Sequence, residues 1–193
     1  MTSDPSDRAV RPFRTALSAR DSGDDGDERW NDVGEHATVV VGVDGSEGSR
    51  AALQYAMGDA ARRGARVLVV RAFEPQLDEP VPYGLPRPPT LAEITSRLEA
   101  GAREMAECVA ADPRAGNGRV PVDVAAIPGA PAKVLVHQAR DADVLVLGRR
   151  GRGGIASMLL GSVGLACVLH APCPVTIVRP DRHVAEPAAP AAV

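Results

Sequence analysis

The sequence predicts an α/β domain built on a parallel sheet, and three observations support this fold class. Short β-branched runs alternate with segments of helical periodicity. Most of the runs are apolar on successive residues, which is typical of strands buried on both faces. Hydrophobic residues make up 45% of the chain but aromatic residues only 3%, so we expect a core of Val, Leu, Ile and Ala.

The first elements form a βαβ unit. The first predicted strand is TVVVGV, residues 38–43, and it ends at the turn-forming sequence DGS. Residues 50–63 carry Ala and Leu at helical spacing and are followed by Gly64, a helix stop. A second buried strand over residues 67–73 completes the unit, whose length is typical of this motif.

The middle of the chain continues the alternation. Residues 75–89 are rich in proline and predict a long loop. Thr90, with Glu93 three residues later, predicts a capping box at the start of a helix over residues 91–111. A Gly-Asn-Gly turn and a third strand over residues 120–127 follow. The apolar stripe of the helix is predicted to consist of Leu91, Ile94, Leu98, Met105 and Val109.

The last third adds two helices and two strands. Pro131 is well placed at the start of a helix that runs to residue 140. Residues 143–147 form the fourth predicted strand, residues 162–170 the last helix and residues 175–178 the fifth strand. Five strands alternating with four helices indicate a parallel sheet.

Composition limits the partners and the compartment. Residues 1–36 are polar and acidic, and residues 181–193 are rich in Ala and Pro, so we predict disordered tails around an ordered domain of residues 37–180. The net charge of −3 does not favour nucleic acid. No apolar run reaches the roughly 18 residues of a membrane span, and the N-terminus lacks a signal-peptide core. We therefore expect a cytoplasmic protein with no membrane partner and reduced cysteines.

A glycine-rich loop after the fourth strand carries the main functional signal. Gly148, Gly151 and Gly161 are separated by two and nine residues, and Ser162 follows at the start of the last helix. Glycines let the backbone approach an anion, and the free N–H groups of a helix start donate to it. We expect Gly148 to leave room above the sheet, Gly151 to adopt a positive φ and Ser162 to cap the helix. The loop predicts a phosphate site; its alternative interpretation is a mobile surface loop.

The helix start alone does not supply enough affinity. A negative group there gains about 0.3–1 kcal/mol, or about 2 when partly buried. Micromolar binding needs about 8 kcal/mol. Further backbone N–H donors, a divalent cation, or Arg149, Arg150 and Arg152 must supply the remainder. These arginines are also compatible with a solvated surface.

Two other phosphate loops are excluded by residue type. A Walker A loop needs GK[ST], and the single lysine of the chain, Lys133, lies in a different helix. Residues 151–156 fit GxGxxA, but a dinucleotide loop opens the first βα turn and has an acidic residue about 20 positions later. Here the loop follows the fourth strand, so NAD is not the expected ligand.

Asp44 is a candidate second half of the site. It follows the first strand, and the ligands of open α/β sheets bind at the carboxyl ends of the strands. A carboxylate at this place commonly holds ribose hydroxyls. Asp44 could equally stabilise its own turn or cap the next helix. The residue type alone leaves both interpretations open.

Three segments together resemble the universal stress protein family, in its ATP-binding branch. They are TVVVGVDGSEGSRAAL, the spacing of the three loop glycines with Ser162, and the ending HAPCPVTIVRP. The resemblance covers residues 38–180 and implies an adenine-nucleotide α-hydrolase-like fold. In that fold an open sheet of five parallel strands, in the order 3-2-1-4-5, has helices on both faces. Strands one and four are then neighbours, which brings Asp44 and Gly148 to one crevice.

The resemblance also implies the ligand and the residues around it. The ligand would be ATP with Mg²⁺, and Asp44 would hold its ribose. Gly42, Val43 and Ala72 would line the adenine slot. The phosphates would be surrounded by residues of the loop and the helix start: Gly148, Arg149, Gly151, Arg152, Gly153, Gly161, Ser162 and Val163.

Family members usually form homodimers through the last strand. In this sequence that strand comprises Val175, Thr176, Ile177 and Val178. A terminal strand of Val, Thr and Ile is an exposed template for such pairing. A homodimer is therefore the expected assembly.

The expected function is regulatory ATP binding in a stress response, with at most weak ATPase activity. No residue near the loop has the setting of an activated nucleophile or a general base, so we predict no catalytic residue and no metal site made by the protein. One alternative is a binding module for AMP or cyclic AMP. The other is an adenylating or pyrophosphate-splitting enzyme of the same superfamily, although its HxGH and SGGxDS signatures are absent.

Overall fold

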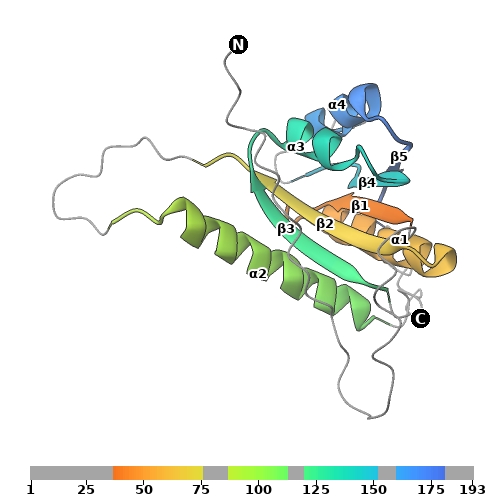
Figure 1. Ribbon diagram of the computed structural model, residues 1–193, viewed down its shortest axis with the longest axis horizontal. Helices are drawn as coiled ribbons and strands as arrows, with labels where there is room; N and C mark the ends of the chain where they lie inside the picture. Colours follow the sequence, from red (N-terminus) through yellow and green to blue (C-terminus); the bar gives the residue numbers. More distant parts are fainter. Residues whose placement is uncertain (1–36, 76–86, 113–119, 152–159, 181–193) are drawn as a thin grey trace, which may run out of the picture.

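The computed structural model describes residues 37–75, 87–112, 120–151 and 160–180. In these residues a five-stranded parallel sheet lies between two layers of helices (Figure 1). The strands are β1 (Thr38–Gly42), β2 (Arg66–Phe73), β3 (Val122–Pro128), β4 (Val144–Gly148) and β5 (Val175–Val178). The helices are α1 (Glu47–Arg63), α2 (Leu91–Ala110), α3 (Pro131–Gln138) and α4 (Ser162–His170).

The strand order is β3-β2-β1-β4-β5, which confirms the expected topology. β1 is central, and Val41 lies between Val69 of β2 and Val146 of β4. The chain moves outward from β1 to β3 in one direction and then through β4 to β5 in the other. The order reverses between β1 and β4, which is where open α/β sheets bind ligands.

Alternate residues of the strands supply two separate cores. On one face Val39, Val41 and Val67 pack with α1 and α2. On the other face Val40 and Leu145 pack with α3 and α4. All five side chains are 0% exposed. The central strands are therefore buried on both faces, as their continuous apolar runs predict.

Helix α1 begins three residues before its predicted start. Ser46, predicted only as part of a turn, is the N-cap, and its Oγ accepts a hydrogen bond of 3.2 Å from the N–H of Ser49. The helix therefore begins at Glu47. It ends as predicted, with Gly64 in the left-handed conformation at φ 65°.

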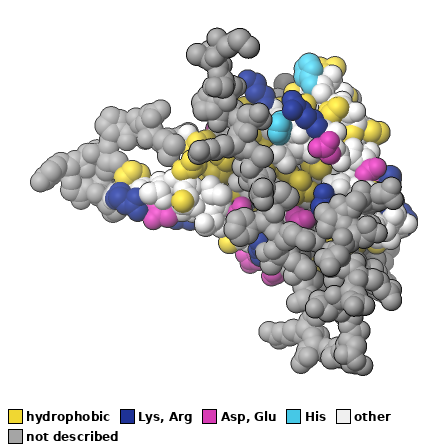
Figure 2. All heavy atoms as spheres, viewed as in Figure 1, with side chains coloured by type: hydrophobic (Ala, Val, Ile, Leu, Met, Phe, Trp, Pro, Cys, Tyr) yellow, Lys and Arg dark blue, Asp and Glu magenta, His cyan; other side chains and the backbone are white. Residues whose placement is uncertain are grey.

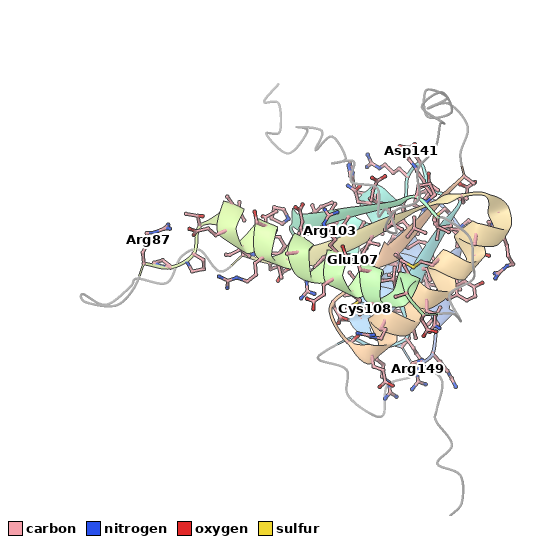
Figure 3. All side chains as sticks on the ribbon, turned by 90° about the horizontal axis from the view of Figure 1, so that it is seen from below. Arg87, Arg103, Glu107, Cys108, Asp141 and Arg149 are labelled. Atoms are coloured by element: carbon pink, nitrogen blue, oxygen red, sulfur yellow. The ribbon has the colours of Figure 1, made fainter. Side chains whose placement is uncertain are left out.

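Helix α2 confirms its predicted cap and corrects its predicted stripe. Thr90 and Glu93 form a capping box. Of the predicted stripe Val109 is buried and Met105 is partly buried against the core, and the other buried positions are Ala102 and Ala106. The first turns of α2 extend past the sheet toward Arg87, whereas Glu107 and Cys108 mark the part beside the sheet (Figure 3). The early apolar residues thus have no sheet beneath them.

The other element boundaries shift by only one or two residues from the predicted ones, a scatter expected at element ends. The predicted tails, most of the proline-rich loop and the Gly-Asn-Gly turn lie outside the described residues. Within the described ranges no helix has the length and apolar character needed to cross a membrane.

Candidate nucleotide site

A cavity of about 600 Å³ lies at the carboxyl edge of the sheet, where the strand order reverses between β1 and β4. This volume is within the range of small-molecule sites, about 300–1,000 Å³. Two of the twelve predicted site residues, Arg152 and Gly153, lie outside the described residues. The other ten all line the cavity: Gly42, Val43, Asp44, Ala72, Gly148, Arg149, Gly151, Gly161, Ser162 and Val163.

Asp44 lies at the cavity and also stabilises its own turn. The N–H of Ser46 donates a hydrogen bond of 3.0 Å to Oδ1 of Asp44. The carboxylate is half-buried and borders the cavity. The two sequence interpretations of this residue are therefore compatible, because one carboxylate can hold its turn and still face a ligand.

Gly148 is needed for a reason that differs from the predicted one. It ends β4, and its backbone lies against the first turn of α1. A Cβ at Gly148 would come within 2.6 Å of the carbonyl oxygen of Gly48, and a Cβ at Gly48 would come within 2.6 Å of the carbonyl oxygen of Arg150. These glycines let α1 approach the glycine loop closely. Their main structural role is packing rather than leaving open space above the sheet.

Gly151 is also constrained differently from the prediction. Among the described glycines only Gly45, Gly64 and Gly129 have a positive φ, so the expected positive φ of Gly151 is wrong. A Cβ at Gly151 would instead collide with the carboxylate of Asp44. Glycine at this position lets the loop lie directly against the aspartate.

The start of α4 corrects the predicted cap. Gly161 is the N-cap, and Ser162 is the first helical residue. No side chain of the described residues caps this helix. Among the described residues, the N–H groups of Ser162, Val163 and Gly164 have no hydrogen-bond acceptor. All three residues line the cavity, so the start of α4 offers unpaired donors to it.

Arg149 joins the cavity to two neighbouring elements through its backbone. Its N–H donates to the carbonyl of Val178 at 2.8 Å, at the end of β5. Its carbonyl accepts from the N–H of Gly161 at 3.1 Å. One residue therefore fixes the end of β5 and the start of α4 relative to β4.

The cavity has further lining residues that were not predicted. Ser49 comes from the first turn of α1, Pro131 and Leu135 come from α3, and Arg71 and Phe73 come from the end of β2. Phe73 supplies an apolar wall suited to a planar base. The residues at the end of β2 could have been predicted from the sequence, because β2 lies beside β1 and the ends of neighbouring parallel strands meet at one edge of the sheet. No local sequence pattern indicates that residues of α3 line the cavity.

The sheet order and the position of the cavity define the class of fold. A parallel sheet in the order 3-2-1-4-5 with a cavity at the reversal point is the arrangement of doubly wound α/β proteins that bind a ligand at the carboxyl ends of their strands. The universal stress protein family model matches residues 36–179. This chain therefore belongs to the universal stress protein family.

Individual relatives agree with this assignment. A universal stress protein of Thermus aquaticus is 37% identical over 144 residues, which cover 74% of this chain and 98% of the relative. One of Mycobacterium tuberculosis strain H37Rv is 34% identical over 149 residues, covering 75% of this chain and 46% of the relative. The chain thus spans about half the length of this mycobacterial relative.

Solved structures share the fold. Universal stress protein UspA from Lactobacillus plantarum superposes with a TM-score of 0.57 at 22% identity, covering 76% of this chain and 99% of that chain. A universal stress protein solved in complex with cAMP has a TM-score of 0.53 at 28% identity, covering 76% of this chain and 98% of that chain. A similar protein therefore binds an adenine nucleotide.

Proposed function

We propose that this protein binds ATP in the cavity between β1 and β4 and acts as a regulatory, nucleotide-dependent protein of the stress response. The observation that carries the proposal is the uncapped start of α4. Its N–H groups at Ser162, Val163 and Gly164 border the cavity and have no acceptor among the residues that the structure describes, and such donors favour phosphate.

The remaining walls of the cavity suit the rest of a nucleotide. We propose that Gly42, Val43 and Ala72, which line the cavity, form an apolar slot for the base. Asp44 lies between this slot and the glycine loop, where its carboxylate can accept from ribose hydroxyls. Arg149 and Arg150 also border the cavity and supply positive charge for phosphates.

Magnesium would accompany the triphosphate. The described residues contain no group of three or more His, Cys, Asp or Glu side chains that could hold a metal ion. Mg²⁺ would therefore be held mainly by phosphate oxygens and water, as it usually is with nucleotides. When bound, it would neutralise phosphate charge. Any hydrolysis of the bound nucleotide is proposed to be weak.

The second candidate ligand is cyclic AMP or AMP. The solved relative in complex with cAMP favours it. The base slot and Asp44 would serve either ligand, whereas the glycine loop is extensive enough for a longer phosphate chain. Competition between the ligands separates these candidates. ATP with Mg²⁺ should displace a fluorescent adenine nucleotide at lower concentration than cAMP or AMP does.

Variants at Asp44 test the role of its carboxylate. Asp44→Asn keeps an Oδ1 acceptor for Ser46 and removes the charge, whereas Asp44→Ala removes both. We expect both variants to weaken ATP binding at least about tenfold, as the loss of 1.4 kcal/mol would. Asp141→Asn is the matched control, because Asp141 is exposed and lies at the opposite end of β4 from Arg149 (Figure 3). Wild-type affinity in both Asp44 variants would refute this assignment.

We also propose a homodimer through the exposed edge of β5. The other edge is shielded, since α2 packs beside β3 and Oε1 of Glu99 accepts from the N–H of Ala126 at 3.4 Å. The carbonyls of Pro174 and Val178 accept from β4, so in a parallel ladder the backbone groups of Val175 and Ile177 point away from the sheet.

Amide hydrogen exchange tests this pairing. Dimerisation should slow exchange at Val175 or Ile177, while Thr176, which already bonds to β4, should change little. Fast exchange at both outward amides in a sample shown to be dimeric would place the interface elsewhere.

A further inference from the structure

Strands β2 and β3 are covered unequally on their two faces. Successive side chains of a strand point to opposite faces of the sheet. The side chains on the face toward α2 are buried, and they include Val67, Val69, Val122 and Val124. On the opposite face four apolar side chains are only partly buried: Leu68, Ala72, Ala125 and Ile127. We call these four residues the β2–β3 face.

The described helices of the second layer leave the β2–β3 face partly uncovered. On this side α3 packs on β2 and against α4, and α4 packs on β5. Figure 1 shows α2 alongside β3, whereas α3 and α4 lie on the other side of the sheet, toward β4 and β5. Hydrophobic side chains reach the surface over this part of the molecule (Figure 2). The β2–β3 face is thus an apolar strip at the margin of the second core.

We propose that residues 21–36, which we call the Trp30 segment, dock on the β2–β3 face. The segment leads directly to the start of β2, because the carbonyl of Ala37 accepts from the N–H of Arg66 at 3.0 Å. Trp30 precedes Ala37 by seven residues, which span up to about 23 Å when extended. The length of β2 is similar. Trp30 can therefore reach any position along the face.

The apolar residues of the segment and its tether both suit this face. Trp30 and Val33 are its two large apolar side chains, and burying them against other apolar side chains is favourable. Because the segment and the face belong to one chain, their effective concentration is about millimolar, which favours the segment over a second copy or a separate protein. For residues 30–36 this proposal differs from the disordered tail that composition predicts.

The charges of the segment and of α3 are complementary. Lys133, His137 and Arg140 are exposed on α3, and their spacing places them along one side of the helix. Figure 2 shows basic and His side chains gathered over this helix layer. Residues 21–28 of the segment contain four Asp and one Glu. Because α3 packs on β2, docking of Trp30 on the β2–β3 face brings this acidic run within reach of the basic side of α3.

Fluorescence of the full chain tests this proposal, because Trp30 is its single tryptophan. We expect native emission at a shorter wavelength than in denaturing urea, and acrylamide quenching at least about threefold weaker, because tethering keeps the segment mostly docked. Ala125→Glu places a charge on the β2–β3 face and should raise quenching toward its value in urea. Leu91→Glu, at an exposed leucine on α2, is the matched control and should leave quenching unchanged. Circular dichroism shows whether each variant is folded.

A reciprocal test leaves the sheet itself unchanged. Trp30→Ala should shift the methyl resonances of Ala125 and Ile127 in ¹³C NMR spectra, because an indole ring packed on these methyl groups displaces their resonances. The methyl groups of Ile94 on α2 are the control and should not shift. Neither experiment involves a nucleotide, so the result is independent of the proposed function.

Three results would overturn the proposal. Equal quenching of Trp30 in native and urea-denatured protein would show that the segment does not dock. A protected Trp30 in folded Ala125→Glu, together with unshifted methyl resonances of Ile127 in Trp30→Ala, would locate the docking elsewhere. Protection that is lost on dilution of the protein would show that the face binds a second copy, because docking within one chain does not depend on protein concentration.

Discussion

At the residue scale, the glycines around the cavity have two separable roles. Gly148 packs on the backbone of α1, whereas Gly161 has room for a methyl group, with Arg149 O at 3.7 Å and φ at −70°. Gly148 and Gly161 belong to the same glycine pattern in the sequence, but only Gly148 is held in place by close contact with another backbone segment. Substitution by alanine should distinguish packing from ligand contact.

Gly148→Ala should destabilise the protein without any ligand. Its Cβ would meet backbone atoms of Gly48, which cannot move like a side chain. Overpacking of this kind costs about 1–3 kcal/mol. Urea unfolding should therefore show a lower free energy of unfolding for Gly148→Ala. An unchanged midpoint would mean that α1 can shift away from the loop.

Gly161→Ala should affect binding more than stability. The new methyl group meets only ordinary contacts, and exchanging glycine for alanine at an N-cap costs less than about 1 kcal/mol. We expect the ATP affinity to fall at least about fivefold, because the methyl group occupies space beside the N–H donors of α4. A titration of the folded variant measures this. Undiminished affinity would show that phosphates do not approach Gly161.

Cysteine reactivity gives another test at this scale. Burial raises the pKa of the Cys167 thiol to about 11, so it stays protonated and inert at neutral pH. Cys108 is exposed. Brief treatment of the native protein with iodoacetamide should modify Cys108 well before Cys167, as peptide mass spectrometry can show. Equally fast modification of both would contradict the packing of α4 on the sheet.

At the scale of elements, the sequence predicts the order of strands and helices well because each strand is a short apolar run. It predicts less well what depends on distant partners. The periodicity of α2 shows which residues are apolar, but not that its buried positions are Ala102, Ala106 and Val109, all in its second half. The contact between Gly148 and Gly48 joins two elements that are far apart in sequence. The residues next to each glycine therefore do not indicate which backbone atoms lie against it.

The same limit applies to the candidate site. Residues at strand ends and in the glycine loop could be predicted because each has a local pattern. Leu135 lines the cavity only because α3 packs over β1 and β4, and no local pattern marks it. The uncapped start of α4 was missed because Ser162 is a good N-cap residue by type, although it lies one position inside the helix.

The capping box of α2 should make the protein sensitive to acid. The N–H of Thr90 donates to Glu93 at 2.6 Å, and this bond, more than the nearby Arg87, lowers the pKa of Glu93 below its ordinary 4.5. The stabilisation is therefore present above pH 4.5 and is lost as the pH falls through the lowered pKa. Because Glu93 is exposed, the effect should be small.

Comparing thermal midpoints between pH 7 and pH 3 tests this cap. The wild type should lose slightly more stability on acidification than Glu93→Gln, whose side chain does not titrate. Thr90→Ala removes the other half of the box and should cost about 0.5–2 kcal/mol. Parallel pH curves for the wild type and Glu93→Gln would show that the ionised carboxylate adds no stability.

At the scale of the whole molecule, the reversal of strand order places the ligand site beside the exposed sheet edge. The cavity opens where β1 and β4 meet, and α4 extends from that cavity along β5. A nucleotide in the cavity and a second copy paired at β5 would therefore contact neighbouring elements.

The central claim is that phosphate groups bind the unpaired N–H groups at the start of α4. A titration of ¹⁵N-labelled protein with ATP and Mg²⁺, followed by amide NMR, tests it most directly. We predict the largest saturable shifts at the amides of Ser162, Val163 and Gly164, with smaller shifts near Asp44. Unchanged α4 amides at saturating ATP, or shifts confined to another surface, would contradict the claim.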